Sequence, residues 1–137
     1  MQPSLQPGVS LTRQLTVDLA RTIGFMGEDA RVYATPSMIL DVEQTCRELI
    51  LHHADAGEDS VDMEVSVKHL AATLVDMTVE ISVTVAAVEG RKVTFEVAAK
   101  DNIEPICSGT HVRFVVDVNK TKERLKAKAA KRDAQKK

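Results

Sequence analysis

The stretch VYATPSMILDVEQTC, from Val32 to Cys46, decides the fold of this chain. It predicts a helix, because Thr35 is a good N-cap residue and Pro36 a favoured first helical residue. At 100° per residue, the apolar side chains of this helix lie within an arc of about 120°, and they are Met38, Ile39, Val42, Cys46, Leu49 and Ile50. One face of the helix is therefore suited to burial, and Glu43 lies at its margin, about 20° beyond Ile50.

Strand patterns flank the helix on both sides. Before it, Val9 to Val17 keeps a period of two with Arg13 as the exception, whereas Arg21 to Ala34 predicts a loop or a short helix. After it, apolar and polar residues alternate strictly, and the face expected to be buried carries Val61, Met63, Val65, Val67 and His69. Three further strands are expected near residues 77–88, 92–99 and 106–118, separated by the turn signals VEGRK and KDN.

The order of these elements indicates the class of fold. One strand, one helix and then four strands predict an α+β protein, in which an antiparallel sheet of about five strands wraps around one long central helix. This arrangement is the hotdog fold. With 137 residues, of which 44% are hydrophobic, the chain has an ordinary size for one domain. We expect this domain at residues 1–119 and a basic C-terminal tail at residues 120–137.

Charge is distributed unevenly along the chain. The formal net charge is −2, but the tail holds 9 of the 18 basic residues and 2 of the 20 acidic ones, so it carries +7 against −9 for the rest. The tail has no aromatic residue for base stacking and a single large apolar residue, Leu125. It is therefore expected to be solvated and partly helical, and nucleic-acid binding is not expected.

The sequence also bears on compartment and cofactors. It shows neither a signal-peptide pattern nor 18 consecutive apolar residues, so we expect a cytoplasmic protein that does not enter a membrane. Cys46 and Cys107 have no cysteine or histidine neighbour at metal-ligand spacing. They are expected to be buried free thiols, and we predict neither a metal nor a cofactor.

Three polar residues stand out by position: Thr35 at the helix start, Glu43 at the margin of the buried face, and His69 at the end of the next strand. Each has an ordinary structural role open to it. Thr35 serves as a cap, and Glu43 pairs with Arg47 in a surface ion pair that contributes about 0.2–0.5 kcal/mol. His69 serves as a strand-end histidine that bonds to backbone. For each residue taken singly, the structural role is favoured.

The alternative is that the three side chains meet in one cleft. A desolvated Glu43 has a raised pKa, which suits a nucleophile or the base that activates water. His69 then supplies or removes a proton near neutral pH. Together the three residues fit the hydrolysis of an activated acyl group.

Three segments, VYATPSMILDVEQTC, VSVKHLAAT and SGTHVRF, resemble hotdog-fold acyl-CoA thioesterases of the fluoroacetyl-CoA thioesterase type in order and approximate spacing. The resemblance runs from about Leu15 to Val118. It implies that Thr35, Glu43 and His69 form the catalytic set, with Glu43 as nucleophile or as the base for water. It also implies an acyl-CoA substrate with a short or small acyl group, and a homodimer with active sites at the subunit interface. A non-catalytic hotdog module that binds acyl-CoA or another apolar carboxylic ligand is the alternative.

The sequence departs from this family at two places. The segment Arg21 to Ala34 is shorter than the family's phenylalanine-bearing lid and offers only Phe25, and Leu74 to Asp76 replaces a Pro-Pro-Gly turn. In the third segment, His111 and Arg113 share one strand face. Arg113 is assigned as a substrate-binding residue that meets a CoA phosphate. Two alternatives stay open for it: a solvated side chain, which is favoured, and an ion pair with an acid.

Overall fold

The computed structural model describes residues 1–136, so Lys137 of the expected tail lies outside the described residues. The body contains one long helix, α1 (Thr35–Leu51), and five long strands, which are β1 (Ser10–Thr16), β4 (Glu58–His69), β5 (Thr78–Glu89), β6 (Lys92–Lys100) and β7 (Pro105–Asp117). Short elements between β1 and α1 are η1 (Leu19–Arg21), β2 (Thr22–Ile23), η2 (Glu28–Ala30) and β3 (Val32–Tyr33). A second helix, α2 (Val118–Gln135), follows β7.

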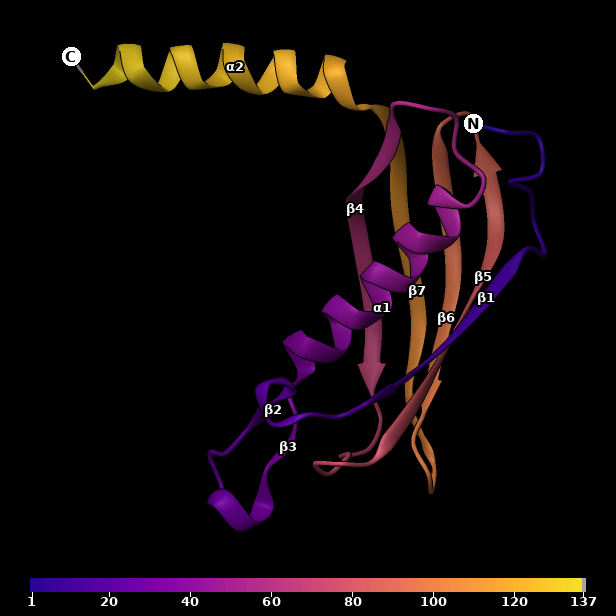
Figure 1. The fold of residues 1–137 in the computed structure, drawn as a ribbon, viewed down its shortest axis with the longest axis vertical. Coiled ribbons are helices and arrows are strands. Elements are labelled where there is room, and N and C mark those ends of the chain that lie inside the picture. Colours follow the sequence, from indigo (N-terminus) through magenta and orange to yellow (C-terminus); the bar gives the residue numbers. More distant parts are fainter. Residues whose placement is uncertain (137) are drawn as a thin grey trace.

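The five long strands form one antiparallel sheet in the order β1-β5-β6-β7-β4. Figure 1 shows α1 lying across one face of this sheet, and α1 contacts β1, β4, β5 and β7. The prediction of a five-stranded antiparallel sheet around one central helix is confirmed, and the arrangement is that of the hotdog fold.

The predicted helix face forms the centre of the core. Its fully buried apolar side chains are Met38, Val42, Cys46, Leu49 and Ile50, whereas Ile39 is half-buried. They pack against alternate residues of the sheet, among them Val79, Ile81, Val83, Phe95 and Val115. Both cysteines are free and buried, as the sequence predicts.

The helix start differs from the prediction. The N-cap residue is Ala34, and Thr35 is already the first helical residue, with no side-chain hydrogen bond to the backbone of the first turn. The prediction that Thr35 caps the helix is therefore wrong. The reason is that the Thr35 hydroxyl bonds instead to the side chain of His69, at the end of β4.

The second difference lies in β4, where a β-bulge falls between Asp62 and Glu64. Before the bulge, Asp62 is paired with Arg113; after it, Val65 is paired with His111. Directly opposed residues share a face of the sheet, and the extra residue of a bulge shifts the alternation by one. The prediction that Asp62 and Val65 lie on opposite faces is therefore wrong, since both face α1.

β4 also forms one edge of the sheet. Three of its apolar side chains are open to solvent in the single chain, with exposed fractions of 42% for Val61, 56% for Met63 and 40% for Val65. An exposed apolar edge strand offers unpaired backbone groups to another strand. The edge is thus a surface suited to pairing with a second chain.

The segments outside the sheet were predicted only in outline. Arg21 to Ala34 contains the short η2 turn, but it also forms the two-residue strands β2 and β3, which are too short to show a period of two. α2 has no buried residue, and its N-cap is Asp117, whose side chain accepts a hydrogen bond from the Lys120 amide. Figure 1 shows α2 projecting away from the body. Among residues 1–136, neither helix is both long and apolar enough to cross a membrane.

Candidate active site

The first part of the site joins the start of α1 to the end of β4. The Thr35 hydroxyl lies 2.7 Å from Nδ1 of His69. Burial lowers the pKa of His69, against an opposing effect of the Ala71 backbone, so the imidazole is neutral near pH 7. Its Nε2 atom is buried and has no hydrogen-bond partner within residues 1–136. A buried nitrogen without a partner is costly.

This pair borders a pocket of about 450 Å³. The pocket is lined by the short elements before α1 and by the segment after β4, and its apolar lining includes Ile23, Phe25, Met26 and Leu70. Each of these four side chains is 47% exposed or more, so the pocket is open to solvent in the single chain. An apolar hollow with a few convergent polar groups is the usual form of a small-molecule site.

Glu43 does not lie beside Thr35 and His69. It follows Thr35 by eight residues on α1, a rise of about 12 Å. Instead, ligand atoms of Glu43, Asp62 and His111 lie within 4.8 Å of one another. The single chain thus brings Thr35 and His69 together and keeps Glu43 in a second cluster.

Burial raises the pKa of Glu43, and the hydrogen bond and charge of Asp62 raise it further, to about 7, while Arg113 opposes the shift. The predicted rise in the pKa of Glu43 by desolvation is confirmed. Its predicted ion pair with Arg47 is wrong. Arg47 instead pairs with Asp59 on β4, with Nη2 2.7 Å from Oδ2 and Nε 2.9 Å from Oδ1.

Arg113 is buried, with a side chain only 6% exposed. Its guanidinium donates to the Ser60 hydroxyl at 2.7 Å, to the Ser60 carbonyl at 2.9 Å, and to Asp62. The solvated alternative is therefore wrong, and pairing with an acid is confirmed. Contact between Arg113 and a CoA phosphate stays a prediction. Ser60 and Asp62 already accept hydrogen bonds from most of the N–H groups of Arg113.

Asp62 is the residue that sequence reasoning missed. Its strand position predicts a side chain that faces away from the helix, and only the bulge reverses this. The three ligand atoms of Glu43, Asp62 and His111 could hold a cation by their spacing. The Arg113 guanidinium already occupies the Asp62 carboxylate, however, and a metal ion would have to be placed beside that positive charge.

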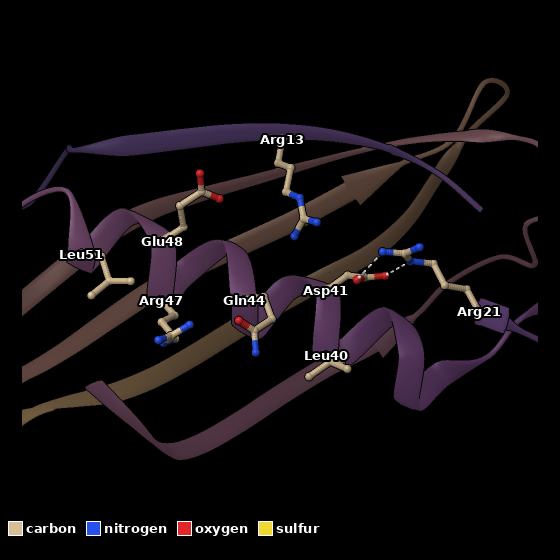
Figure 2. Close-up of a pocket in the computed structure, with 8 residues that line it drawn as sticks. All are labelled: Arg13, Arg21, Leu40, Asp41, Gln44, Arg47, Glu48 and Leu51. Carbon is tan, nitrogen blue, oxygen red and sulfur yellow. Dashed lines mark hydrogen bonds and ion pairs between the residues drawn. The ribbon is translucent and has the colours of Figure 1, made fainter. Parts of the chain in front are cut away.

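A hollow of about 620 Å³ lies elsewhere, over the outer face of α1. Figure 2 shows that Arg13 reaches toward α1 from β1 and that Arg21 bonds to Asp41. Arg21 also pairs with Asp18, and the charge of Arg47 is balanced by Asp59. The hollow includes neither the Thr35–His69 pair nor the cluster of Glu43, Asp62 and His111. Of its three arginines, Arg21 and Arg47 are paired with carboxylates. Its size therefore does not make it the active site.

The antiparallel sheet surrounds one helix. A threonine-histidine pair lies at the start of this helix, and a desolvated glutamate lies in the middle of the helix. These features define a hotdog-fold protein of the thioesterase superfamily. The chain belongs to the fluoroacetyl-CoA-specific thioesterase family, whose model matches residues 17–119. Over 135 residues it is 28% identical to the fluoroacetyl-CoA thioesterase of Streptantibioticus cattleyicolor, covering 93% of this chain and 97% of that protein.

Solved structures agree with this membership. The structure of the fluoroacetyl-CoA thioesterase FlK matches with a TM-score of 0.83 and 27% identity, covering 90% of this chain and 97% of that one. A mutant of FlK in complex with fluoroacetate and CoA matches with a TM-score of 0.79 and 29% identity, covering 85% and 99%. A thioesterase superfamily member from Thermus thermophilus matches with a TM-score of 0.88 and 25% identity, covering 98% and 99%.

Proposed function

We propose that this chain hydrolyses an acyl-CoA thioester with a short or small acyl group to the free acid and coenzyme A, using Thr35, Glu43 and His69. The observation that carries the proposal is the Thr35–His69 hydrogen bond at the mouth of an apolar pocket, with Nε2 of His69 left without a partner among residues 1–136. Membership of the thioesterase family and the names of its relatives support the reaction.

Each residue has a role that follows from its environment. Glu43 either adds to the thioester carbonyl itself or removes a proton from the water that does so. Thr35 holds the imidazole of His69 by its hydrogen bond, and His69 assists proton transfer to the departing thiolate. In the nucleophilic route, Glu43 displaces the thiolate to form an anhydride, which water then hydrolyses to the free acid and the Glu43 carboxylate. In the base route, water displaces the thiolate directly. In both routes the carbon–sulfur bond breaks, and the proton that water loses ends on the thiolate.

The proposal includes a homodimer, because one chain keeps the catalytic residues apart. On β4, Asp62 lies beside Glu43 and His69 lies beside Thr35. Asp62 and His69 are seven residues apart, or about 23 Å in a strand. Antiparallel pairing of two β4 edges would cover Val61, Met63 and Val65 and place the His69 end of one strand beside the Glu58 end of the other. We therefore propose that Thr35 and His69 of one subunit act with Glu43 of its partner.

The direct test is steady-state hydrolysis of an acyl-CoA panel, from acetyl through aromatic acyl groups, followed with a thiol reagent. Wild type is expected to turn over at least one substrate. Glu43→Ala and His69→Ala should each cost about 100-fold or more, the range for general acid–base groups. A wild type that binds acyl-CoA but releases no thiol from any substrate would favour the non-catalytic binding module instead.

Two further assignments belong to this proposal. We retain a hotdog domain at residues 1–119 with a basic segment at 120–137, which carries a net charge of +7. We also retain a cytoplasmic location, which the two free, buried cysteines support, because free thiols are usual in reducing compartments.

A further inference from the structure

A second carboxylate, Asp62 on β4, faces Glu43 between the sheet and α1. The bulge in β4 turns Asp62 toward α1, where a carboxylate oxygen of Asp62 lies within 4.8 Å of one of Glu43. Asp62 is also directly paired across the sheet with Arg113. Two acidic side chains from different elements therefore converge on one buried guanidinium, and two neighbouring carboxylates do not both ionise freely.

The contacts decide which of the two acids is anchored. Arg113 donates to Oδ1 of Asp62, whereas its nearest contact with Glu43 is with the main-chain oxygen at 3.5 Å. The Arg113 guanidinium is itself held by Ser60, through the hydroxyl at 2.7 Å and the carbonyl at 2.9 Å. Asp62 thus has a fixed cationic partner, whereas within residues 1–136 the Glu43 carboxyl group has none at such short range.

His111 completes the surroundings. Its Nδ1 lies 2.8 Å from the carbonyl oxygen of Glu64, which can only accept, so Nδ1 carries the ring proton. Burial lowers the pKa of His111, and the ring is therefore neutral, with Nε2 3.3 Å from the Arg113 guanidinium and 3.2 Å from Oδ1 of Asp62. On α1, burial raises the pKa of the Cys46 thiol to about 12, so it is uncharged. Among these neighbours, only Asp62 and Arg113 act on Glu43 with a full charge.

We infer that Asp62 is a positioning residue that shares one proton with Glu43, keeping Glu43 the more basic of the two carboxyl groups. The inference rests on the proposed role of Glu43 as base or nucleophile. The protonated Glu43 donates to the Asp62 carboxylate, which Arg113 keeps ionised. When Glu43 loses that proton to solvent, its carboxylate becomes able to attack the thioester or to activate water.

The charge balance agrees with this assignment. Partial burial works to raise the pKa of Asp62, but the hydrogen bond from Glu43 and the charge of Arg113 lower it overall. The same Asp62 carboxylate contributes to the opposite shift of Glu43. A base whose pKa lies near the operating pH combines a useful ionised fraction with high proton affinity. Asp62 therefore adds to the basicity that burial gives Glu43, and so favours hydrolysis near neutral pH.

The experiment is a titration of Glu43 by ¹³C NMR in protein labelled at the glutamate carboxyl carbon, with the resonance assigned by its loss in Glu43→Gln. It is carried out on wild type, on Asp62→Asn and on Glu96→Gln as a control. Glu96 is exposed on β6, so its substitution removes one negative charge away from the cluster. In parallel, kcat/KM is measured against pH for the best acyl-CoA of the panel.

In Asp62→Asn, we expect the titration midpoint of Glu43 and the acid limb of kcat/KM to move down together by about one pH unit or more. Glu96→Gln should leave both in place. A Glu43 midpoint that stays within about 0.3 of wild type in Asp62→Asn would overturn the inference, as would a loss of activity that is uniform across pH. If Asp62→Asn does not fold, Asp62→Gly gives the same titration without the carboxylate.

The two readouts separate the two proposals. If wild type hydrolyses no acyl-CoA but Glu43 titrates as expected in both proteins, the proton sharing holds and the proposed function fails. If hydrolysis is observed and the midpoint does not move, the proposed function stands and the role of Asp62 is rejected.

Discussion

The Thr35 hydroxyl and Nδ1 of His69 lie 2.7 Å apart, although 34 residues separate them in the chain. The bond joins the first residue of α1 to the last residue of β4. It orients the imidazole so that Nε2 remains without a hydrogen-bond partner within residues 1–136, beside the apolar pocket. The threonine thus acts on a side chain distant in sequence, and its expected effect on the helix itself is small.

Removal of this hydroxyl should affect catalysis more than stability. We expect Thr35→Ala to lower kcat by about 10- to 100-fold, because His69 loses the group that orients it, while Thr35→Ser keeps most of the activity. Steady-state kinetics on both variants, with thermal unfolding as the control, checks this. Equal losses in Ala and Ser variants would contradict an orienting hydroxyl, as would a large fall in the melting temperature of Thr35→Ala.

Hydrolysis should rise with pH through neutrality. The pKa of Glu43 is raised to about 7 by burial and by Asp62, so Glu43 is mostly protonated, and inactive as a base, below that pH. The pKa of His69 is lowered from its usual value, so its neutral form is already present there. We expect kcat/KM to increase about tenfold between pH 6 and pH 8. A flat or falling profile over this range would exclude Glu43 as the base.

Subunit mixing should reveal whether the site is shared. Glu43→Ala and His69→Ala homodimers are each expected to be nearly inactive. When the two are unfolded together and refolded, half of the dimers are hybrids, and in a shared-site dimer each hybrid has one intact site. We therefore expect about one quarter of wild-type activity.

The control for mixing is a preparation of each variant refolded alone. Sedimentation at the assay concentration establishes that dimers are present. If the mixture remains as inactive as its parents while hybrids are demonstrably formed, then Glu43 and His69 act within one chain.

A fourth prediction concerns a buried polar group that lines the hollow of Figure 2. Asp41 is buried and accepts hydrogen bonds from the Tyr33 hydroxyl at 2.5 Å and from Nε of Arg21 at 2.9 Å. Asp41→Ala leaves the buried Tyr33 hydroxyl without its acceptor and removes one of the two carboxylate partners of Arg21, which keeps its ion pair with Asp18. We expect a loss of about 2 kcal/mol in the free energy of unfolding, measured by urea denaturation. Glu48→Ala on the exposed side of the same helix serves as the control and should change stability by less than about 0.5 kcal/mol.

Local periodicity was enough to predict the elements of the fold. The apolar arc of α1 and the alternation in the strands depend only on neighbouring residues, and the structure has these elements in the predicted order. The same patterns selected Thr35, Glu43 and His69 as candidates. They do not single out Asp41, a polar residue buried on α1, because its burial depends on Tyr33 and Arg21 from other segments.

The sequence by itself determined the helix, the five-stranded sheet and three residues suited to acyl hydrolysis, because these features follow from periods of 3.6 and 2 and from residue chemistry. Only the tertiary structure decided which side chains meet. The β4 bulge reverses the direction of Asp62, and pairing between β4 and β7 places Arg113 and His111 beside it. Asp62 and Arg113 are 51 residues apart in the chain. No local period carries information about such contacts, and register and burial create them only when the sheet closes around the helix.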